Sequence, residues 1–586
     1  MADELQRTKK IWERLRRKSH VPKEERKVLV DELYDIITGR VKEFVLKHDA
    51  VRAVQTAIKY STSSQRRQIA NELRGTYAQL AESRYAKFLI GKLLVQNDAE
   101  IRDLIIPEFY GKVRKLINHP EASWILDDIY RGVATGEQKA ILLREWYGSE
   151  FALFTPEKGS KPTADLAQIL DKEPAKRPIV LKYLFDMING LIQKKMTGFT
   201  MLHDAMLQYF LAVKVESEES REFSEVIKGD ENGDLLKNMA FTGSGSRLVC
   251  LLLAHGTAKE RRLLLKAFKD TYELMAGDPY GHRIILTAYD VIDDSVATAK
   301  AIFPELLGKG DERNAEKIIF LANDPNARTT ILYLFEGTAR SLFPANHTTD
   351  LDILTEIQEI RKATSKKEPE TRRRELIAAL SPLLLVPITA SITDLVSTSF
   401  GCQFVADVML SAVGDKVSAL EALASTAGGE PNDVADRTSY PPPPPHLSLT
   451  PHGGRMFKTL VAGGRFDKKT GRIRPAEPPL HFADILYPVL KDHVVSWATG
   501  PSSFTVVSLL EADDFSFKDE LILSLRGNRD ALDKSATEET SEQKAKRKTH
   551  PDGDSTERES KGSHALSKQD RTVGNLGARI LLEKIV

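Results

Sequence analysis

Cationic and aromatic side chains recur at a fixed spacing along this chain. Arg52, Phe88 and Trp124 stand 36 residues apart, each near the start of an apolar helical pattern. Arg247 and Arg283 are again separated by 36 residues. Cationic groups can hold phosphates and aromatic faces can stack on any base, so this spacing suits the binding of nucleic acid.

The elements that carry these residues are predicted to be helices, because apolar residues recur every three or four positions and alternating strand patterns are scarce. A period near 36 holds about three short helices, which cannot bury their apolar faces alone and must stack. The sequence therefore predicts an all-α protein, a curved α-solenoid of about eleven repeats. The weaker copies lie near Thr200, Thr329, Gln403, Met456, Phe504 and Arg579.

Charge alone leaves the partner open. The chain has 586 residues and a net charge of only +1, but residues 1–150 hold 28 Lys/Arg against 22 Asp/Glu. This surplus fits either a polyanion partner or an ordinary solvated basic helix. Cys250 and Cys402 form no CxxC pair, which disfavours zinc or a disulfide framework. The apolar stretch from Leu376 to Ile392 contains two prolines, so we expect a buried, broken helix and no membrane partner.

Four segments interrupt the helical pattern. Residues 155–178 are rich in Lys, Pro and Gly and are predicted to be a loop insertion, and residues 216–234 a second loop. Residues 425–454 include five consecutive prolines, typical of an extended linker, although they could also dock a proline-binding partner. Residues 528–572 are polar and charged and are predicted to be disordered, so their deletion should leave folding intact.

Catalytic signatures are missing from the sequence. It contains no HExxH, no Walker-type GxxxxGK and no GxSxG motif. The pairs Asp127–Asp128 and Asp293–Asp294 could supply carboxylates to a metal, but adjacent helical residues point about 100° apart and rarely chelate one ion. We therefore expect a protein that is not an enzyme and that uses no cofactor and no metal.

Several segments resemble one branch of the pumilio family. The segments are residues 9–18 (KKIWERLRRK), 255–262 (HGTAKERR), 289–295 (YDVIDDS) and 364–376 (TSKKEPETRRREL). They are similar to the Puf-A family, whose members carry pumilio repeats followed by a CPL domain. The family's long charged N-terminal extension has no counterpart in this sequence.

The resemblance implies a domain order and a role. It implies a basic helix at 1–22, repeats one to three at 23–154, repeats four to seven at 179–345, and a CPL domain with divergent repeats eight to eleven at 346–586. It further implies an L-shaped monomer of the nucleus and nucleolus. Such a protein would bind pre-rRNA, with messenger RNA as a second candidate, and pre-ribosomal proteins during assembly of the large ribosomal subunit.

In pumilio repeats, three positions of one helix face RNA: the first and third contact a base edge and the second stacks between bases. Transferred to this chain, most edge positions lack a hydrogen-bonding group, as at Val51, Gly91 and Leu286, and Asp127 would repel phosphate. We therefore expect weak sequence preference. The predicted RNA-binding residues are Arg52, Gln55, Arg84, Lys87, Phe88, Lys92, Arg114, Lys115, Trp124, Ser246, Arg247, His282 and Arg283.

Other interpretations of these residues remain open. Phe88 and Trp124 also suit a helix core, Arg114 and Lys115 a solvated face, and His282 a cap. If the RNA interpretation holds, charge reversal at Arg52, Lys87, Arg247 and Arg283 should weaken RNA binding and leave thermal stability nearly unchanged. Two other functions compete: a sequence-specific repressor of messenger RNA, and a solenoid scaffold that binds proteins.

Overall fold

The computed structural model describes residues 2–17, 21–47, 50–153, 161–230, 233–308, 311–344, 348–431, 445–467, 470–539 and 573–586. Helices make up most of them, and the all-α solenoid prediction is confirmed. The sheet found in these ranges is one antiparallel hairpin of β1 (Gly464–Asp467) and β2 (Arg472–Pro475). The chain divides into two compact units, Met1–Leu252 (unit 1) and Leu253–Val586 (unit 2). The number of repeats stays a prediction.

Unit 1 repeats as groups of three short helices, as the period of 36 predicts. The elements are α1 (Ala2–Arg16), α2 (Lys23–Ile37), α3 (Val41–Val45), α4 (Val51–Tyr60), α5 (Ser63–Glu72), α6 (Tyr77–Glu82), α7 (Lys87–Leu94), α8 (Ala99–Ile105), η2 (Ile106–Phe109), α9 (Val113–Ile117), α10 (Ala122–Gly132), α11 (Gly136–Arg144), η3 (Glu145–Tyr147), α12 (Ser149–Leu153), α13 (Leu166–Lys172), η4 (Pro174–Lys176), α14 (Arg177–Gln193), α15 (Thr200–Ala212), α16 (Glu218–Lys228), α17 (Asp234–Ala240) and α18 (Gly243–His255), which crosses the boundary.

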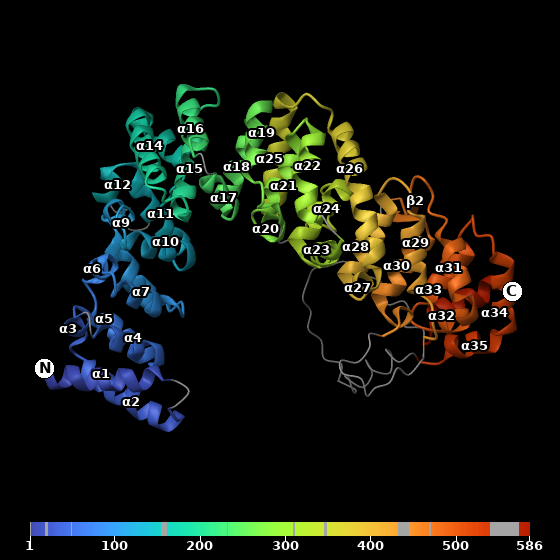
Figure 1. The fold of residues 1–586 in the computed structure, drawn as a ribbon, viewed down its shortest axis with the longest axis horizontal. Helices are drawn as coiled ribbons and strands as arrows, with labels where there is room; N and C mark the ends of the chain where they lie inside the picture. Colours follow the sequence, from blue (N-terminus) through green and yellow to red (C-terminus); the bar gives the residue numbers. More distant parts are fainter. Residues whose placement is uncertain are drawn as a thin grey trace, which may run out of the picture. The chain divides into compact units, whose positions relative to one another are not determined.

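The middle helices of successive repeats pack on one another. Helix α4 contacts α7, α7 contacts α10, α10 contacts α15, and α1 covers the free side of α4. In Figure 1, α4, α7 and α10 stand one above another, while α3, α6 and α9 lie on the other side of unit 1. We call α1, α4, α7 and α10 the inner row. Each helix buries one apolar stripe, such as Val54 and Ile58 of α4, and leaves its opposite face exposed.

One turn recurs in the first three repeats. Glycines that precede the first helix adopt positive φ, a backbone conformation that only glycine adopts without strain; they are Gly39 (φ 77°), Gly75 (84°) and Gly111 (77°). A carboxylate from the end of the same repeat's third helix accepts two backbone N–H bonds from each turn, at 2.5–3.2 Å. The three carboxylates belong to Glu72, Glu108 and Glu145. These bonds fix each repeat as a rigid unit.

Unit 2 continues with longer helices. Its elements after α18 are α19 (Ala258–Ala267), α20 (Tyr272–Gly277), α21 (His282–Val291), α22 (Ser295–Leu307), α23 (Asp311–Asn323), α24 (Pro325–Glu336), α25 (Thr348–Thr364), α26 (Pro369–Ala390), α27 (Ile392–Val396), α28 (Ser399–Ser411), α29 (Val417–Ser425), η6 (Leu447–Leu449), α30 (Pro451–Val461), α31 (Phe482–Leu490), η7 (Lys491–His493), α32 (Val494–Thr499), α33 (Ser503–Glu511), α34 (Lys518–Gly527), α35 (Arg529–Thr537) and α37 (Leu576–Lys584).

In unit 2, α21, α24, α28, α30 and α33 pack in succession, and α25 packs along α21. The string 364–376 explains how the chain turns from α25 into α26. Buried Arg372 donates to the carbonyls of Asp290 (2.6 Å) and Ile292 (3.1 Å) and to Oδ1 of Asp293 (2.8 Å). Burial opposes ionisation of Asp293, but hydrogen bonds from Ser365, from two backbone amides and from Arg372 outweigh it and hold its pKa well below the usual range. This string therefore has a structural role.

Several predicted loops are wrong. Residues 166–172 form α13, which Asp165 caps, and residues 177–178 begin α14, where Pro178 occupies the first turn. Residues 218–228 form α16, capped by Ser217. Residues 529–537 form α35, which buries Leu532 and Ala536 against α32 and α37, so the prediction of disorder over 528–572 is wrong for these residues. Residues 447–454 form η6 and the start of α30; residues 432–444 and 540–572 lie outside the described ranges.

The apolar stretch from Leu376 to Ile392 lies mostly within α26. This helix is buried on one side, as expected, but it runs unbroken through Pro382 and Pro387. In the part of the chain that the structure describes, no helix has the length and apolar character to span a membrane.

Candidate nucleic-acid interface

A hollow of about 270 Å³ opens on the inner row of unit 1, where α1, α4 and α7 meet. Its walls combine four cationic side chains with two aromatic rings and two hydrogen-bonding groups over an apolar residue. They are Trp12, Leu15, Arg16, Arg52, Gln55, Thr56, Lys59, Tyr60 and Lys92. We call it the α1/α4 hollow.

The aromatic ring at the centre of the hollow is Trp12 of α1. The guanidinium carbons of Arg16 and Arg52 lie 5.5 Å and 5.8 Å from the centre of this ring, which is cation–π distance. The other arginines of α1 are held by α2: Arg7 makes a bidentate pair with Glu32 at 2.6 and 2.7 Å, and Arg14 with Glu25 at 2.8 and 3.1 Å. Because Arg7 and Arg14 are paired with α2, Arg16 is the arginine of α1 that lines the hollow.

The charged side chains that line the hollow are all positive. Its lining contains no acidic residue, and none of its four cations forms an ion pair with any residue that the structure describes. Four unpaired cations around one concavity repel each other, and a bound polyanion would relieve that repulsion. Stacking on a ring and pairing with phosphate can then occur together, as in sites for single strands.

The inner row carries further aromatic groups beyond the hollow. Phe88 of α7 is 52% exposed and Trp124 of α10 is 57% exposed, which is unusual for large apolar side chains. Trp124 also meets Phe199 edge-on, with ring centres 4.9 Å apart, so its orientation is fixed. The structure thus places Arg52, Phe88 and Trp124 on successive helices that contact one another, in the order in which a strand would meet them.

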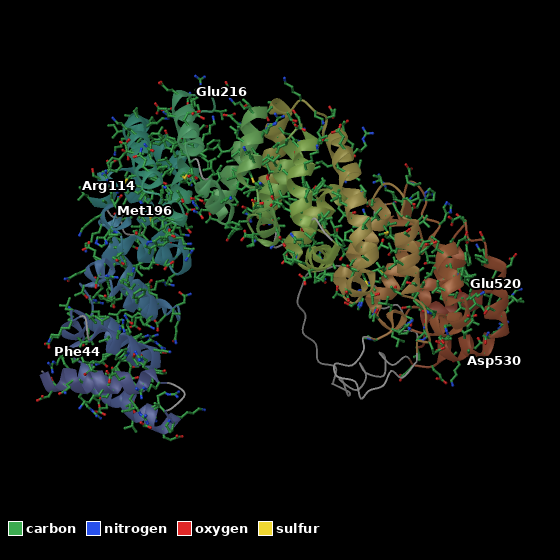
Figure 2. The ribbon with its side chains drawn as sticks, in the orientation of Figure 1. Phe44, Arg114, Met196, Glu216, Glu520 and Asp530 are labelled. Atoms are coloured by element: carbon green, nitrogen blue, oxygen red, sulfur yellow. The ribbon has the colours of Figure 1, made fainter. Side chains whose placement is uncertain are left out.

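Four predicted cations of the first three repeats lie outside the hollow. Arg84 is exposed before α7, with its guanidinium 5.7 Å from the ring of Tyr85, and Lys87 pairs with Glu121 at 2.6 Å. Arg114 and Lys115 belong to α9, outside the inner row, and Figure 2 labels Arg114 on that side. Arg114 stacks on Tyr183 at 4.2 Å, and Lys115 pairs with Glu82 at 2.5 Å. Lys87 and Lys115 are thus paired with carboxylates, and Arg84 and Arg114 lie over tyrosine rings.

The base-edge positions of the first three repeats offer little for base readout. Val51 and Ser123 are buried, and Gly91 has no side chain. Gln55 already donates from Nε2 to the carbonyl of Tyr85 at 3.1 Å. Asp127 does not face a phosphate as expected: it is buried and accepts the amide of Met201 at 3.0 Å, at the start of α15.

Burial raises the pKa of Asp127 to about 6, and the backbone hydrogen bonds from Met201 and Thr200 offset only part of that increase. Its carboxylate therefore holds the start of α15 rather than a ligand.

The predicted residues beyond repeat three are mostly buried. Ser246 is fully buried and donates to the carbonyl of Gly243 at 3.1 Å, and Arg247 is half-buried on α18. His282 and Arg283 are 1% and 8% exposed, because both bind Asp350 of α25. Reversing the charge of Arg283 would place two carboxylates together in a buried site, so we expect a loss of stability there rather than unchanged stability.

Trp12, Arg16, Lys59 and Tyr60 complete the hollow but were missing from the sequence prediction. Trp12 and Arg16 belong to a helix that precedes the first repeat, so a search at a period of 36 does not find them. Lys59 lies seven positions after Arg52, two helical turns along the same face, so the sequence alone predicts that these two cations lie side by side. Among the described residues, no group of three or more His, Cys, Asp or Glu side chains could hold a metal ion.

Comparison with known proteins identifies the family. The CPL (NUC119) domain model matches residues 323–471. The chain is 32% identical to pumilio homology domain family member 6 of Schizosaccharomyces pombe, over 91% of this chain and 78% of that protein. It is 29% identical to human pumilio homolog 3, over 80% of this chain and 68% of that protein.

Solved structures give the same result. The crystal structure of human Puf-A is similar to this chain with a TM-score of 0.72 and 28% identity, over 91% of this chain and 98% of the Puf-A chain. A second Puf-A structure, in complex with DNA, gives a TM-score of 0.71. This chain therefore belongs to the Puf-A-like family of pumilio homology proteins that carry a CPL domain.

Proposed function

We propose that this protein binds single-stranded RNA along the inner row of unit 1, with little sequence preference, and that it does so without catalysing a reaction. The observation that carries the proposal is the α1/α4 hollow: its lining holds Trp12, no acidic side chain, and four cations that form no ion pair with a described residue, two of which lie over the Trp12 ring. The exposed rings of Phe88 and Trp124 extend that surface. Cations hold the backbone at each step and the rings accept any base.

Weak sequence preference follows from the base-edge positions. A bidentate contact to a base contributes roughly 1–3 kcal/mol of discrimination. Val51, Ser123, Gly91 and Asp127 supply no such contact, and Gln55 would have to give up its bond to Tyr85. Human Puf-A, a structural relative, has been crystallised with DNA. A surface that contacts phosphates rather than base edges is expected to bind both RNA and DNA.

Trp12 provides a direct test. Trp12→Ala removes the stacking ring and the group that orders Arg16 and Arg52, and should weaken binding of a fluorescent oligouridine by about 1–3 kcal/mol, or roughly 5- to 150-fold. Trp12→Phe keeps a stacking face and should restore most of the affinity. Binding that is unchanged in Trp12→Ala would rule out the hollow as the binding site.

A panel of unrelated single-stranded RNAs tests the second part of the proposal. Affinities within about tenfold of one another support readout of the backbone. A spread above about a hundredfold would correspond to several base-specific contacts and would support the alternative of a sequence-specific repressor of messenger RNA.

In the cell, we propose a nucleolar role in pre-rRNA processing and assembly of the large ribosomal subunit, alongside pre-ribosomal proteins. The support is membership of the Puf-A-like family and a surface that tolerates any sequence. Crosslinking the tagged protein to cellular RNA, followed by sequencing, tests this role. Fragments from pre-rRNA are expected; fragments confined to messenger RNA would instead favour translational repression, and failure to recover RNA would favour a protein scaffold.

A further inference from the structure

A second hollow, of about 290 Å³, lies on unit 2 between α19, α20 and α22. These are the first and third helices of their repeats, so the hollow is not on the row formed by α21 and α24. Its lining is Arg262, Leu265, Lys266, Lys269, Asp270, Tyr272, Lys300, Ala301, Pro304 and Glu305. We call it the α19/α22 hollow.

Four cationic side chains line this hollow. Arg262 and Lys266 lie four positions apart on α19 and so share one face of that helix, while Lys269 lies just beyond the end of the helix at Ala267. Lys300 of α22 faces them across the hollow. Arg262 pairs with Asp294 at 3.0 Å, but Lys266, Lys269 and Lys300 are exposed and form no ion pair with a described residue.

Unlike the α1/α4 hollow, this one contains acidic residues. Both oxygens of Glu305 accept backbone amides, from Asp270 at 2.8 Å and from Tyr272 at 3.0 Å, so that carboxylate is fixed in the wall. Asp270 is exposed at the mouth. A nucleic-acid backbone would bring its phosphates against these two carboxylates, whereas a peptide can place its own amides there as donors.

The floor of the hollow is apolar. Leu265 and Tyr272 are 6% and 1% exposed, while Ala301 and Pro304 are half-buried at the surface of α22. Such a floor gives contact to aliphatic side chains but stacks no base, since the ring of Tyr272 is covered and donates its hydroxyl to the carbonyl of Leu265 at 2.7 Å. Three free lysines over an apolar floor suit a segment that alternates carboxylate and aliphatic side chains.

We propose that the α19/α22 hollow is a docking site for an acidic, partly aliphatic peptide segment of a protein partner. Carboxylates of the segment pair with Lys266, Lys269 and Lys300, and an aliphatic side chain rests on Leu265, Ala301 and Pro304. The site lies on a different unit from the proposed RNA surface and shares no residue with it. The inference does not depend on the proposed RNA binding.

The test is a selection with short random peptides displayed on phage, using the full chain as target and Lys266→Glu/Lys269→Glu/Lys300→Glu as counter-target. The peptides that survive should be rich in Asp and Glu and contain an aliphatic residue. A synthetic, fluorescein-labelled peptide from this set should bind the triple variant roughly tenfold or more weakly than the unmodified chain. The matched control, Lys362→Glu/Lys491→Glu/Lys534→Glu, changes three other exposed lysines of unit 2 and should bind normally.

Carbodiimide coupling, which joins a carboxylate directly to an amine, should attach the peptide to Lys266, Lys269 or Lys300, as mapped by mass spectrometry. Circular dichroism should show that the variant and its control fold alike, because all six lysines are exposed. Selected peptides that lack acidic residues, or that bind the variant and the chain equally, would overturn the proposal. So would an oligouridine that displaces the peptide and protects these lysines from coupling, because that result would assign the hollow to nucleic acid.

Discussion

The four cations of the α1/α4 hollow make a quantitative prediction about salt. Replacing Arg16, Arg52, Lys59 and Lys92 by Gln removes four positive charges without introducing repulsion. For a single strand, each phosphate contact contributes about 0.7 to the slope of log K against log salt concentration. Loss of four contacts should therefore reduce that slope by about 2.8.

The size of the effect follows from this slope. Between about 50 mM and 200 mM salt, a slope difference of about 2.8 changes the relative affinity roughly 50-fold. The unmodified chain should thus lose about 50-fold more affinity than the variant over this range. Fluorescence anisotropy of a labelled oligouridine, repeated at several salt concentrations, measures both slopes.

The matched control changes four exposed cations of unit 1 that lie outside the inner row: Lys23, Lys27, Arg74 and Lys172. Its slope should stay close to that of the unmodified chain. A slope change below about one in the hollow variant, or an equal change in the control, would refute the assignment of phosphate contacts to the hollow.

Three further predictions concern stability. Glu108→Ala leaves two turn amides without their acceptor and should cost about 1.5–3 kcal/mol in the free energy of unfolding, measured by urea titration of unit 1; an unchanged midpoint would show that the turn needs no carboxylate. Leu532→Ala should destabilise unit 2 by about 2–5 kcal/mol, because this side chain is fully buried in α35, whereas a neutral result would mean that α35 does not pack. Asp127 has its pKa raised to about 6, so the native state binds its proton more tightly than the unfolded state does, and the resulting stability is lost as the pH rises from about 4 to 6. The Asp127→Asn side chain cannot ionise, so the stability of this variant relative to the unmodified chain should increase by about 2–3 kcal/mol over that pH range. Hydrogen exchange of the Met201 amide should become independent of this titration in the variant. A stability difference between variant and unmodified chain that stays constant across pH would refute the raised pKa.

The repeat architecture could be predicted from the sequence because it is local. The same pattern of apolar and polar residues recurs in each repeat, and the period of 36 follows from comparing Arg52, Phe88 and Trp124. A stronger signal was available in Gly39, Gly75 and Gly111, which share that period and mark the turns directly. Composition alone does not indicate α13 and α16, because their helical starts depend on the capping residues Asp165 and Ser217.

The binding surface was harder to predict because it depends on contacts between distant segments. The burial of His282 and Arg283 is caused by Asp350, more than sixty positions away, and no local pattern indicates that α25 lies along α21. Trp12 meets Arg52 only because α1 packs against α4. Spacing identified α4, α7 and α10 as equivalent helices of successive repeats, but the structure was needed to separate exposed side chains from those already engaged.

The most direct test of the central claim is to map where RNA touches the inner row of unit 1. Ultraviolet crosslinking of the full chain to oligouridine, with mass spectrometry of the modified peptides, should place the adducts on Trp12, Tyr60, Phe88 and Trp124. These aromatic residues lie on α1, α4, α7 and α10. Adducts on α5, α8 and α11, with none on α1, α4, α7 or α10, would contradict the claim that the inner row presents one continuous surface to RNA.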